Sequence, residues 1–334
     1  MTTNNPQPTK NEIATRFAYV AVVTPAVLTL AALALQLRWL PETPDPIATH
    51  WSGSGPDRSG SHWTYPLITL FMGFGLSAWL WATALPRLRR GARGWAFRFL
   101  AATAVGFSAF AAVSMTWSVG MQRGLASWSD APSVLPAIVT GLVVGLGAAL
   151  VGWLVLPKQA ITFNALPSAD IDLAETERAV WLGSARASRG AVATIIIAIV
   201  LVAAGAVAAW TSGDYAVMWI FLGLAVLLTA LALTTMEADV RVDSNGVEVR
   251  GPAGFPRSRV PIAEVASADS INVEPLGSFG GWGWRRVPGA MGVVLRGGEA
   301  LRVERKEGHA LVVTVDDSAT AAALLTALAK RAQR

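Results

Sequence analysis

The sequence contains no cysteine among its 334 residues, which excludes disulfides, thiolate metal sites, iron–sulfur clusters and a cysteine nucleophile. It has only three histidines and no dense cluster of acidic residues, so it offers few ligands for a catalytic metal. Charged residues make up 15% of the chain, whereas soluble domains carry about 25%. The apolar residues, 53% of the chain, come largely in long uncharged runs, which excludes an ordinary soluble protein.

Signatures of common enzyme classes are also missing from the sequence. There is no HExxH, no Gly-x-Ser-x-Gly, no Walker A loop and no Rossmann glycine fingerprint. Gly145 and Gly147 lie inside an apolar run and lack the third glycine of a dinucleotide site. We therefore expect a protein without enzymatic activity and without a cofactor.

Six runs are long enough to cross a bilayer as helices, which takes about 20 mainly apolar residues each. None of them contains Asp, Glu, Lys or Arg, so they offer no charged group for a proton or ion path. The first run is too long for the apolar part of a signal peptide, and we expect it to be retained. The six predicted transmembrane helices are Phe17–Leu37, Thr64–Leu85, Phe99–Gly120, Val134–Leu156, Ala191–Ser212 and Tyr215–Met236.

Lysine and arginine are distributed unevenly over the connecting segments, and this bias predicts the orientation. With the N-terminus inside, the inner segments before the last span carry 11 of them and the outer segments carry three. Both termini are then cytoplasmic, and the net charge of +5 reflects topology and attraction to anionic lipid rather than nucleic-acid binding. The predicted parts are an N-terminal tail 1–16, a transmembrane domain 17–236 with outer loop 38–63 and inner loops 86–98 and 157–190, and a cytoplasmic domain 237–334.

Two features of the predicted spans concern helix packing. Gly141, Gly145 and Gly152 lie along one face of the fourth span and would let a neighbouring backbone approach closely. We expect that neighbour to belong to the same chain, with a dimer contact as the alternative. Pro25 is expected to kink the first span and free a carbonyl.

Outer loop 38–63 is too long and too rich in aromatic residues and histidine for a simple connector. Its chemically suggestive side chains are His50, Asp57 and His62, with Trp51 beside them. Two imidazoles and a carboxylate could bind a metal ion or form a sensor that titrates near neutral pH. The interpretation we favour is that they hydrogen-bond the turn and its tryptophans onto the helix ends.

The residues Leu40-Pro41, Pro46–Trp51 and Gly55-Pro56-Asp57 resemble a membrane family called domain of unknown function number 1648. The resemblance covers about residues 20–85 and implies a first span, a Pro–His–aromatic–Gly–Asp segment and a second span. It also implies a bacterial plasma membrane as the location. The family has no established catalytic residues, so none is carried over to this chain.

The two inner loops contain further candidates for contact with lipid. Arg87, Arg89, Arg90 and Arg93 lie beside two span ends and are candidates for binding anionic lipid headgroups, although a topology signal alone explains them. In the second inner loop, acidic residues followed by Arg178 and a broken apolar stripe predict a short interfacial helix over 170–182.

The composition changes after Met236, where alternating apolar and polar residues predict strands. A hairpin is expected over Val240–Arg250 around Asn245-Gly246. Further predicted elements are strands at Arg259–Ile262, Ser270–Val273, Met291–Arg296, Ala300–Glu304 and Ala310–Val315, and an amphipathic helix from Ala319 to about Lys330.

About seven short strands closed by one helix resemble a bacterial pleckstrin-homology-like domain over roughly residues 238–331, with Phe279–Arg286, Gly292–Leu301 and Val312–Asp317 as its local signature. Within that signature, Trp282, Trp284, Arg285 and Arg286 could dock on a membrane or a partner. They could equally pack the glycine-rich loop against the domain, which we favour.

The complete prediction is an α-helical membrane bundle of six transmembrane helices with a small C-terminal β-rich, pleckstrin-homology-like domain. We expect a non-enzymatic binding or sensing module in the lipid bilayer. Its outer loop would recognise a molecule of the envelope, and its cytoplasmic domain would bind lipid or an unknown protein partner. A transporter or permease-like protein using neutral polar groups is the first alternative, and a structural subunit of a membrane complex is the second.

Overall fold

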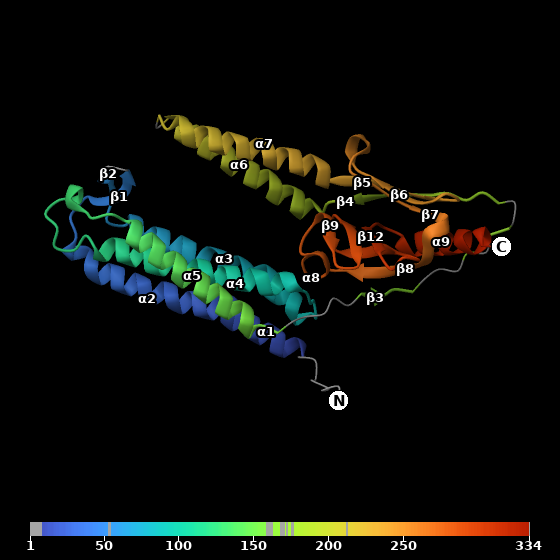
Figure 1. Ribbon diagram of the computed structural model, residues 1–334, viewed down its shortest axis with the longest axis horizontal. Coiled ribbons are helices and arrows are strands. Elements are labelled where there is room, and N and C mark those ends of the chain that lie inside the picture. Colours follow the sequence, from blue (N-terminus) through green and yellow to red (C-terminus); the bar gives the residue numbers. More distant parts are fainter. Residues whose placement is uncertain are drawn as a thin grey trace. The chain divides into compact units, whose positions relative to one another are not determined.

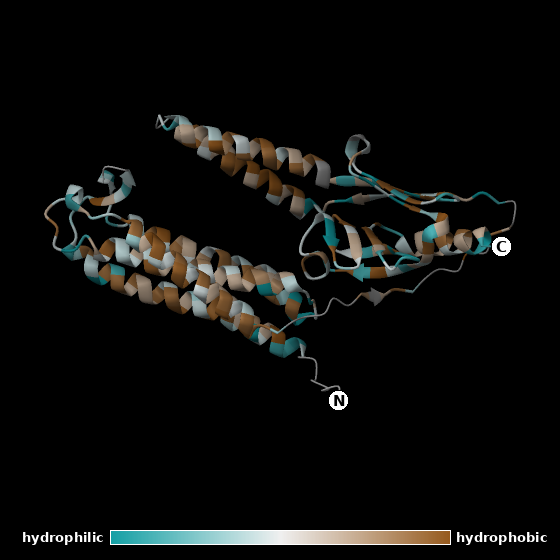
Figure 2. Ribbon diagram, viewed as in Figure 1, coloured by the Kyte–Doolittle hydropathy of each residue, from teal (hydrophilic) through white to brown (hydrophobic). Residues whose placement is uncertain are grey.

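The computed structural model describes residues 9–52, 55–157, 163–167, 171, 173–174, 177–211 and 213–333. The chain divides into two compact units, Met1–Ala160 (unit 1) and Ile161–Arg334 (unit 2). Six helices of the described part are long and apolar enough to cross a membrane, as the sequence predicts. Figure 2 shows that apolar residues cover most of these helices and that hydrophilic residues gather towards their ends.

Unit 1 is a bundle of four long helical segments that run alternately up and down (Figure 1). Helix α1 (Lys10–Ala18) continues through a π-helical turn, Tyr19–Val23, into α2 (Thr24–Trp39). The other helices are α3 (Thr64–Arg89), α4 (Trp95–Gly120) and α5 (Leu135–Val155). Helix α4 is central to the bundle, because it contacts α2, α3 and α5.

The two ends of unit 1 differ in charge. At the first, which we call the hairpin end, α2 is followed by strands β1 (Ile47–Ser52) and β2 (Gly55–Gly60). Its charged residues are Arg38, Arg58, Arg123, Glu42, Asp45, Asp57 and Asp130. At the second, the basic end, α1 begins and α3 turns into α4. Its charged residues in the described part are Lys10, Arg16, Arg87, Arg89, Arg90, Arg93, Arg98 and the acid Glu12.

The break predicted at Pro25 takes the form of the π-helical turn. Proline has no N–H to continue the α-helical ladder, and the N–H of Thr24 bonds to the carbonyl of Tyr19, five residues back. The carbonyl of Pro25 accepts hydrogen bonds from Thr29 Oγ1 at 2.7 Å and from Ser108 Oγ at 3.2 Å. A hydrogen bond from α4 therefore reaches the backbone of α2 directly after the π-helical turn.

Three glycines of α5 face α4 and let the two backbones approach closely. A Cβ at Gly141 would lie 1.9 Å from Ser114 Oγ, and one at Gly145 would lie 2.8 Å from the carbonyl oxygen of Gly106. At Gly152 a Cβ would lie 2.8 Å from a side chain of α4. These separations are too short for any side chain, so the small residues serve packing within one chain.

Unit 2 combines a helical hairpin with two β-sheets. The helical hairpin consists of α6 (Arg189–Thr211) and α7 (Tyr215–Thr235). One sheet is antiparallel, in the order β4 (Trp181–Arg186), β5 (Glu237–Asp243), β6 (Gly246–Arg250) and β7 (Arg257–Pro261). The other has the order β3 (Asn164–Ala165), β8 (Val265–Val273), β11 (Gly298–Arg305), β12 (Ala310–Thr314), β10 (Ala290–Val294) and β9 (Gly283–Val287), with β10 and β12 parallel. The helices α8 (Pro275–Phe279) and α9 (Ser318–Ala332) complete it.

The helical hairpin of unit 2 is a direct continuation of its antiparallel sheet. Strand β4 leads into α6, β5 follows α7, and the two strands pair with each other. An ion pair of 2.7 Å between Arg186 and Glu237 closes the junction. A hydrogen bond of 2.8 Å from the N–H of Ala187 to the carbonyl of Met236 lies beside it. The helices α6 and α7 are thus anchored on paired strands rather than on free loops.

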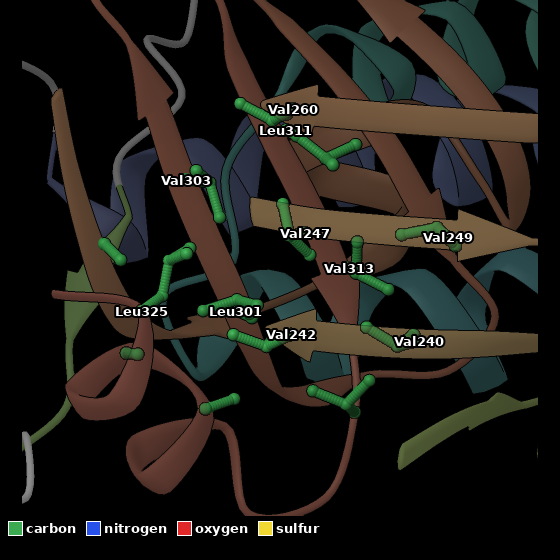
Figure 3. Close-up of a cluster of buried hydrophobic side chains, with 14 of the residues drawn as sticks. Val240, Val242, Val247, Val249, Val260, Leu301, Val303, Leu311, Val313 and Leu325 are labelled. Carbon is green, nitrogen blue, oxygen red and sulfur yellow. The ribbon is translucent and has the colours of Figure 1, made fainter. Parts of the chain in front are cut away.

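The two sheets and α9 enclose the main hydrophobic core of unit 2 (Figure 3). Val240 and Val242 of β5 lie on one side of it, and Leu301 and Val303 of β11 lie on the other. Each pair is two residues apart, because alternate side chains of a strand point to the same face. Leu325 of α9 enters the same core, so the terminal helix closes it as predicted.

The seven predicted strands are confirmed as β5–β8 and β10–β12, and the terminal helix is confirmed as α9. The first turn falls one residue earlier than expected, on Ser244-Asn245, with Gly246 at a φ of +115°. The structure adds β9, which the glycine-rich signature concealed, together with β3 and β4. The β-rich part therefore begins within the predicted inner loop 157–190 and before residue 237.

The interfacial helix predicted over 170–182 is wrong. Residues 177–180 are irregular and Trp181 and Leu182 begin β4, while several other residues of that stretch lie outside the described ones. The edge of β5 offers a ladder of backbone partners to Trp181–Arg186. A short helix with a broken apolar stripe would bury less apolar surface against the protein than strand β4 does. Pairing with the sheet therefore overrides local helix propensity.

We predict that Gly145→Ala lowers the free energy of unfolding of the full-length protein in detergent, by about 1–3 kcal/mol, as overpacking does. The added methyl group would press on the carbonyl of Gly106. Gly147→Ala is the matched control on the same helix, because a Cβ there meets nothing within 4 Å. Thermal or denaturant unfolding measures both, and equal effects of the two variants would contradict this account of the α4–α5 contact.

Candidate functional site

Hydrogen bonds to the backbone of Ala48 attach the hairpin of β1 and β2 to the bundle. Gln122, which is buried just beyond the end of α4, accepts a hydrogen bond from the N–H of Ala48 at 2.8 Å. Its amide nitrogen returns one to the carbonyl of Ala48 at 3.2 Å, and Tyr65 Oη donates to the same carbonyl at 2.8 Å. Gln122 thus takes the place of a neighbouring strand along β1.

Apolar contacts reinforce this attachment beneath the hairpin. Leu40, Ile47, Tyr65 and Val119 form a buried cluster between β1 and the ends of the helices. Because Ile47 and Ala48 are both fully buried, the first two residues of β1 are fixed while the following ones extend towards solvent. The base of the hairpin is therefore rigid and its far part is exposed.

His50 and Asp57 form a pair on the exposed part of the hairpin. Their side chains come from adjacent strands, and His50 Nδ1 lies 2.6 Å from Asp57 Oδ1. The two side chains are 57% and 38% exposed, so the pair is accessible to a binding partner. The hydrogen bond from His50 holds the pKa of Asp57 below its ordinary value. An ionised carboxylate and an imidazole are thus presented together on a fixed support.

His62 does not join this pair, although the sequence analysis grouped it with His50 and Asp57. Its Nε2 lies 2.7 Å from the carbonyl oxygen of Pro44 and 3.9 Å from Asp45 Oδ1, at the base of the loop. Within the described ranges, no three His, Cys, Asp or Glu side chains are close enough to share a metal ion. The metal-site interpretation of the three residues is therefore not supported by their geometry.

Trp51 links the hairpin to the loop between α4 and α5, which lies at the same end of unit 1. Its Nε1 donates a hydrogen bond of 2.9 Å to the carbonyl of Pro132, which lies between α4 and α5. A second link runs from Arg123 to Glu42, at 2.6 Å, with the Arg123 guanidinium 4.9 Å from the Trp39 ring centre. The loops at this end are therefore joined to each other as well as to the helices.

Sequence reasoning missed Gln122, Tyr65, Glu42 and Arg123, which position the hairpin. Gln122 and Arg123 lie far from residues 47–52 along the chain, and no local sequence pattern marks Glu42 or Tyr65 as their partners. The one available signal was the amide of Gln122, a polar side chain immediately after an apolar span. An amide at such a position needs a hydrogen-bond partner when it is buried.

The arginines at the basic end occupy different environments. Arg87 donates to the carbonyl of Thr83 on its own helix, and both Arg87 and Arg93 are half-buried. Arg89 and Arg90 are exposed, so these two are the ones most accessible to a headgroup.

The four candidates in the glycine-rich segment of unit 2 also differ in burial. Trp284 lies on β9 and packs against the main core, whereas Trp282, Arg285 and Arg286 are exposed. Arg285 Nε donates to the carbonyl of Trp282 at 2.9 Å, which holds the turn before β9. Packing therefore accounts for Trp284, and the other three remain free to contact a membrane or partner.

Polar side chains inside unit 1 bond to one another. Gln36 Nε2 donates to Thr69 Oγ1 at 2.8 Å and to Thr116 Oγ1 at 3.1 Å, and Thr29 Oγ1 lies 3.3 Å from Ser108 Oγ. Every buried side-chain polar atom in the described part of unit 1 has a hydrogen-bond partner. These hydrogen bonds join the helices of unit 1 to one another.

No protein-family model matches the chain, and neither a curated protein nor a solved structure matches it. The resemblances to the membrane family number 1648 and to pleckstrin-homology-like domains therefore stay predictions.

We predict that Gln122→Ala loosens the hairpin, because it leaves the buried N–H of Ala48 without a partner. Such a loss costs about 1–3 kcal/mol. Hydrogen exchange of residues 47–52 in the detergent-solubilised protein should become faster. Tyr65→Phe is the matched control, since it removes one of two bonds to the carbonyl of Ala48 and should have a smaller effect. Unchanged exchange in Gln122→Ala would contradict the proposed attachment.

A second prediction concerns pH. The pKa of Asp57 is lower in the folded hairpin than in the unfolded chain, where it is about 3.9. The resulting stabilisation is therefore present above that value and is lost as the pH falls through the folded pKa. Carbon NMR of the Asp57 carboxyl should show a midpoint below the ordinary value, and His50→Ala should raise it. His62→Ala should leave it unchanged, because His62 bonds elsewhere.

Proposed function

We propose that this chain is a non-enzymatic binding or sensing module of a bacterial plasma membrane. The hairpin end of unit 1 faces the outside and recognises a molecule of the envelope. The β-rich part of unit 2, which we interpret as a pleckstrin-homology-like domain, lies in the cytoplasm and contacts lipid or a protein partner.

The orientation in this proposal is supported by the charges at the two ends of unit 1. Lysine and arginine are concentrated on the cytoplasmic side of membrane proteins. In the described part, the basic end has seven of them against one acid, and the hairpin end has three against four acids. If the basic end is inside and all six candidate helices cross, both chain termini are also inside.

The observation that carries the proposal is the exposed His50–Asp57 pair on a hairpin whose base is fixed by Gln122. A loop that served only as a connector would not need a buried amide devoted to its backbone. A rigid support lowers the entropy lost on binding, which favours recognition by the groups it presents. Because Nδ1 of His50 donates to Asp57, Nε2 of the neutral ring is an acceptor, and the partner best suited to the pair has hydrogen-bond donors for both the carboxylate and Nε2.

The structure favours recognition over transport. The polar side chains that the sequence offered for a neutral pathway, such as Gln36, Thr69 and Thr29, bond to one another or to backbone. Opening a path would break these bonds in an environment where water does not replace them. A purely structural role would not require an accessible pair of titratable groups.

The connection between the membrane and the cytoplasmic part also suits a signalling role. Because α6 and α7 continue into the paired strands β4 and β5, a movement of either helix is transmitted to the sheet. The Arg186–Glu237 ion pair lies at the point of transmission.

The absence of cysteine makes the orientation directly testable. We predict that Ser59→Cys, on exposed β2, reacts with a membrane-impermeant maleimide in intact cells. Glu307→Cys, in an exposed turn of unit 2, should react only after the cells are permeabilised. The reverse pattern would overturn the orientation, and the unaltered chain serves as the blank.

Recognition is tested by photo-crosslinking of the full-length protein in its native membrane. A benzophenone side chain at Arg58 on β2 should capture a defined product, and one at lipid-facing Leu146 should not. Adding His50→Ala or Asp57→Asn should reduce the product at least about tenfold, a loss of about 1.4 kcal/mol in binding. A product that survives both substitutions would contradict a role for the pair.

A further inference from the structure

A groove of about 640 Å³ lies between α1, the π-helical turn and the end of α3 at the basic end of unit 1. Its lining changes character along its length. Asn11 and Thr15 of α1 and Arg89 of α3 supply the polar part, and Tyr19 and Val23 of the π-helical turn supply an apolar part. The volume lies within the range of about 300–1,000 Å³ that is typical of small-molecule sites.

The electrostatics of this groove select for a negative charge. Arg89 is exposed and has no carboxylate partner among the described residues, and no acidic residue lines the groove. Among the described residues at this end, the one acid is Glu12, and it already pairs with Arg16 at 2.7 Å. An anion near Arg89 would therefore meet a free guanidinium, which forms two parallel hydrogen bonds to phosphate oxygens.

The apolar part of the groove is also unpartnered. Tyr19 is 61% exposed and Val23 is 45% exposed. They lie between α1 and α2, further from the basic end than α1 and therefore deeper in the predicted membrane. Both belong to the π-helical turn that precedes Pro25, so the irregular backbone shapes this wall. A molecule that fits the whole groove needs an anionic head and an apolar chain.

We infer that the groove binds an anionic phospholipid of the inner leaflet. Arg89, Asn11 and Thr15 hold the phosphate, and one acyl chain lies against Tyr19 and Val23. The inference rests on the membrane orientation proposed above but not on recognition by the hairpin. Failure of the maleimide labelling would remove its premise, whereas failure of the crosslinking would leave it intact.

The test uses the purified full-length protein in detergent, with dioleoyl-phosphatidylglycerol and dioleoyl-phosphatidylcholine as probes. Native mass spectrometry should show that phosphatidylglycerol is retained in preference to phosphatidylcholine. Arg89→Gln should weaken retention of phosphatidylglycerol about fivefold, the contribution of one basic residue near anionic lipid. Arg89→Lys should keep most of it, and Ala18→Trp, which fills the groove, should abolish it.

Arg90→Gln is the matched control, because Arg90 is the next residue, is also exposed and lies outside the groove lining. It should weaken retention of phosphatidylglycerol far less than Arg89→Gln does. Equal losses in the Arg89 and Arg90 variants would overturn the inference in favour of a diffuse basic surface. No preference between the two lipids, or displacement of the lipid by inorganic phosphate alone, would also overturn it. Unfolding measurements on each variant verify that the bundle is intact.

Discussion

Unit 1 depends on the close approach of α4 to its neighbours. In the proposed membrane location, lipid does not drive apolar helices together as water does, so their contact must come from tight packing and internal hydrogen bonds. Gly145 supplies the packing, because its missing side chain lets α5 reach the backbone of α4 at Gly106. Thr29 and Ser108 supply hydrogen bonds that tie α2 to α4. The position of α4 in turn decides where the groups at its ends lie.

The position of α4 also fixes the residues at the hairpin end. Gln122 follows α4 directly, and its amide occupies both backbone groups of Ala48. Two residues further along β1, His50 leaves the buried region and pairs with Asp57. A chain of fixed contacts thus runs from the middle of the bundle to an exposed pair of titratable groups. Exposure with rigidity is the combination that recognition requires, since a rigid group loses little entropy on binding.

Unit 2 shows which strands the local sequence pattern predicts and which it does not. The alternation of apolar and polar residues predicted the strands that contribute Val240 and Leu301 to the core, because such strands bury one face and expose the other to solvent. It did not predict β4, since the edge of β5 that recruits Trp181–Arg186 is more than fifty residues away along the chain. For the same reason Trp284 was ambiguous. Whether a tryptophan packs or protrudes depends on which strands lie beside it.

Hydropathy and the alternation of apolar and polar residues were enough to predict the six long helices and the β-rich C-terminal part. These properties are sums over many residues, and they do not depend on which segments meet. The grouping of His50 with Asp57, the exclusion of His62 from that pair and the attachment by Gln122 came from the tertiary structure. Hydrogen bonds require particular atoms within about 3 Å of each other. Residues distant in sequence reach that separation only when packing brings their backbones together.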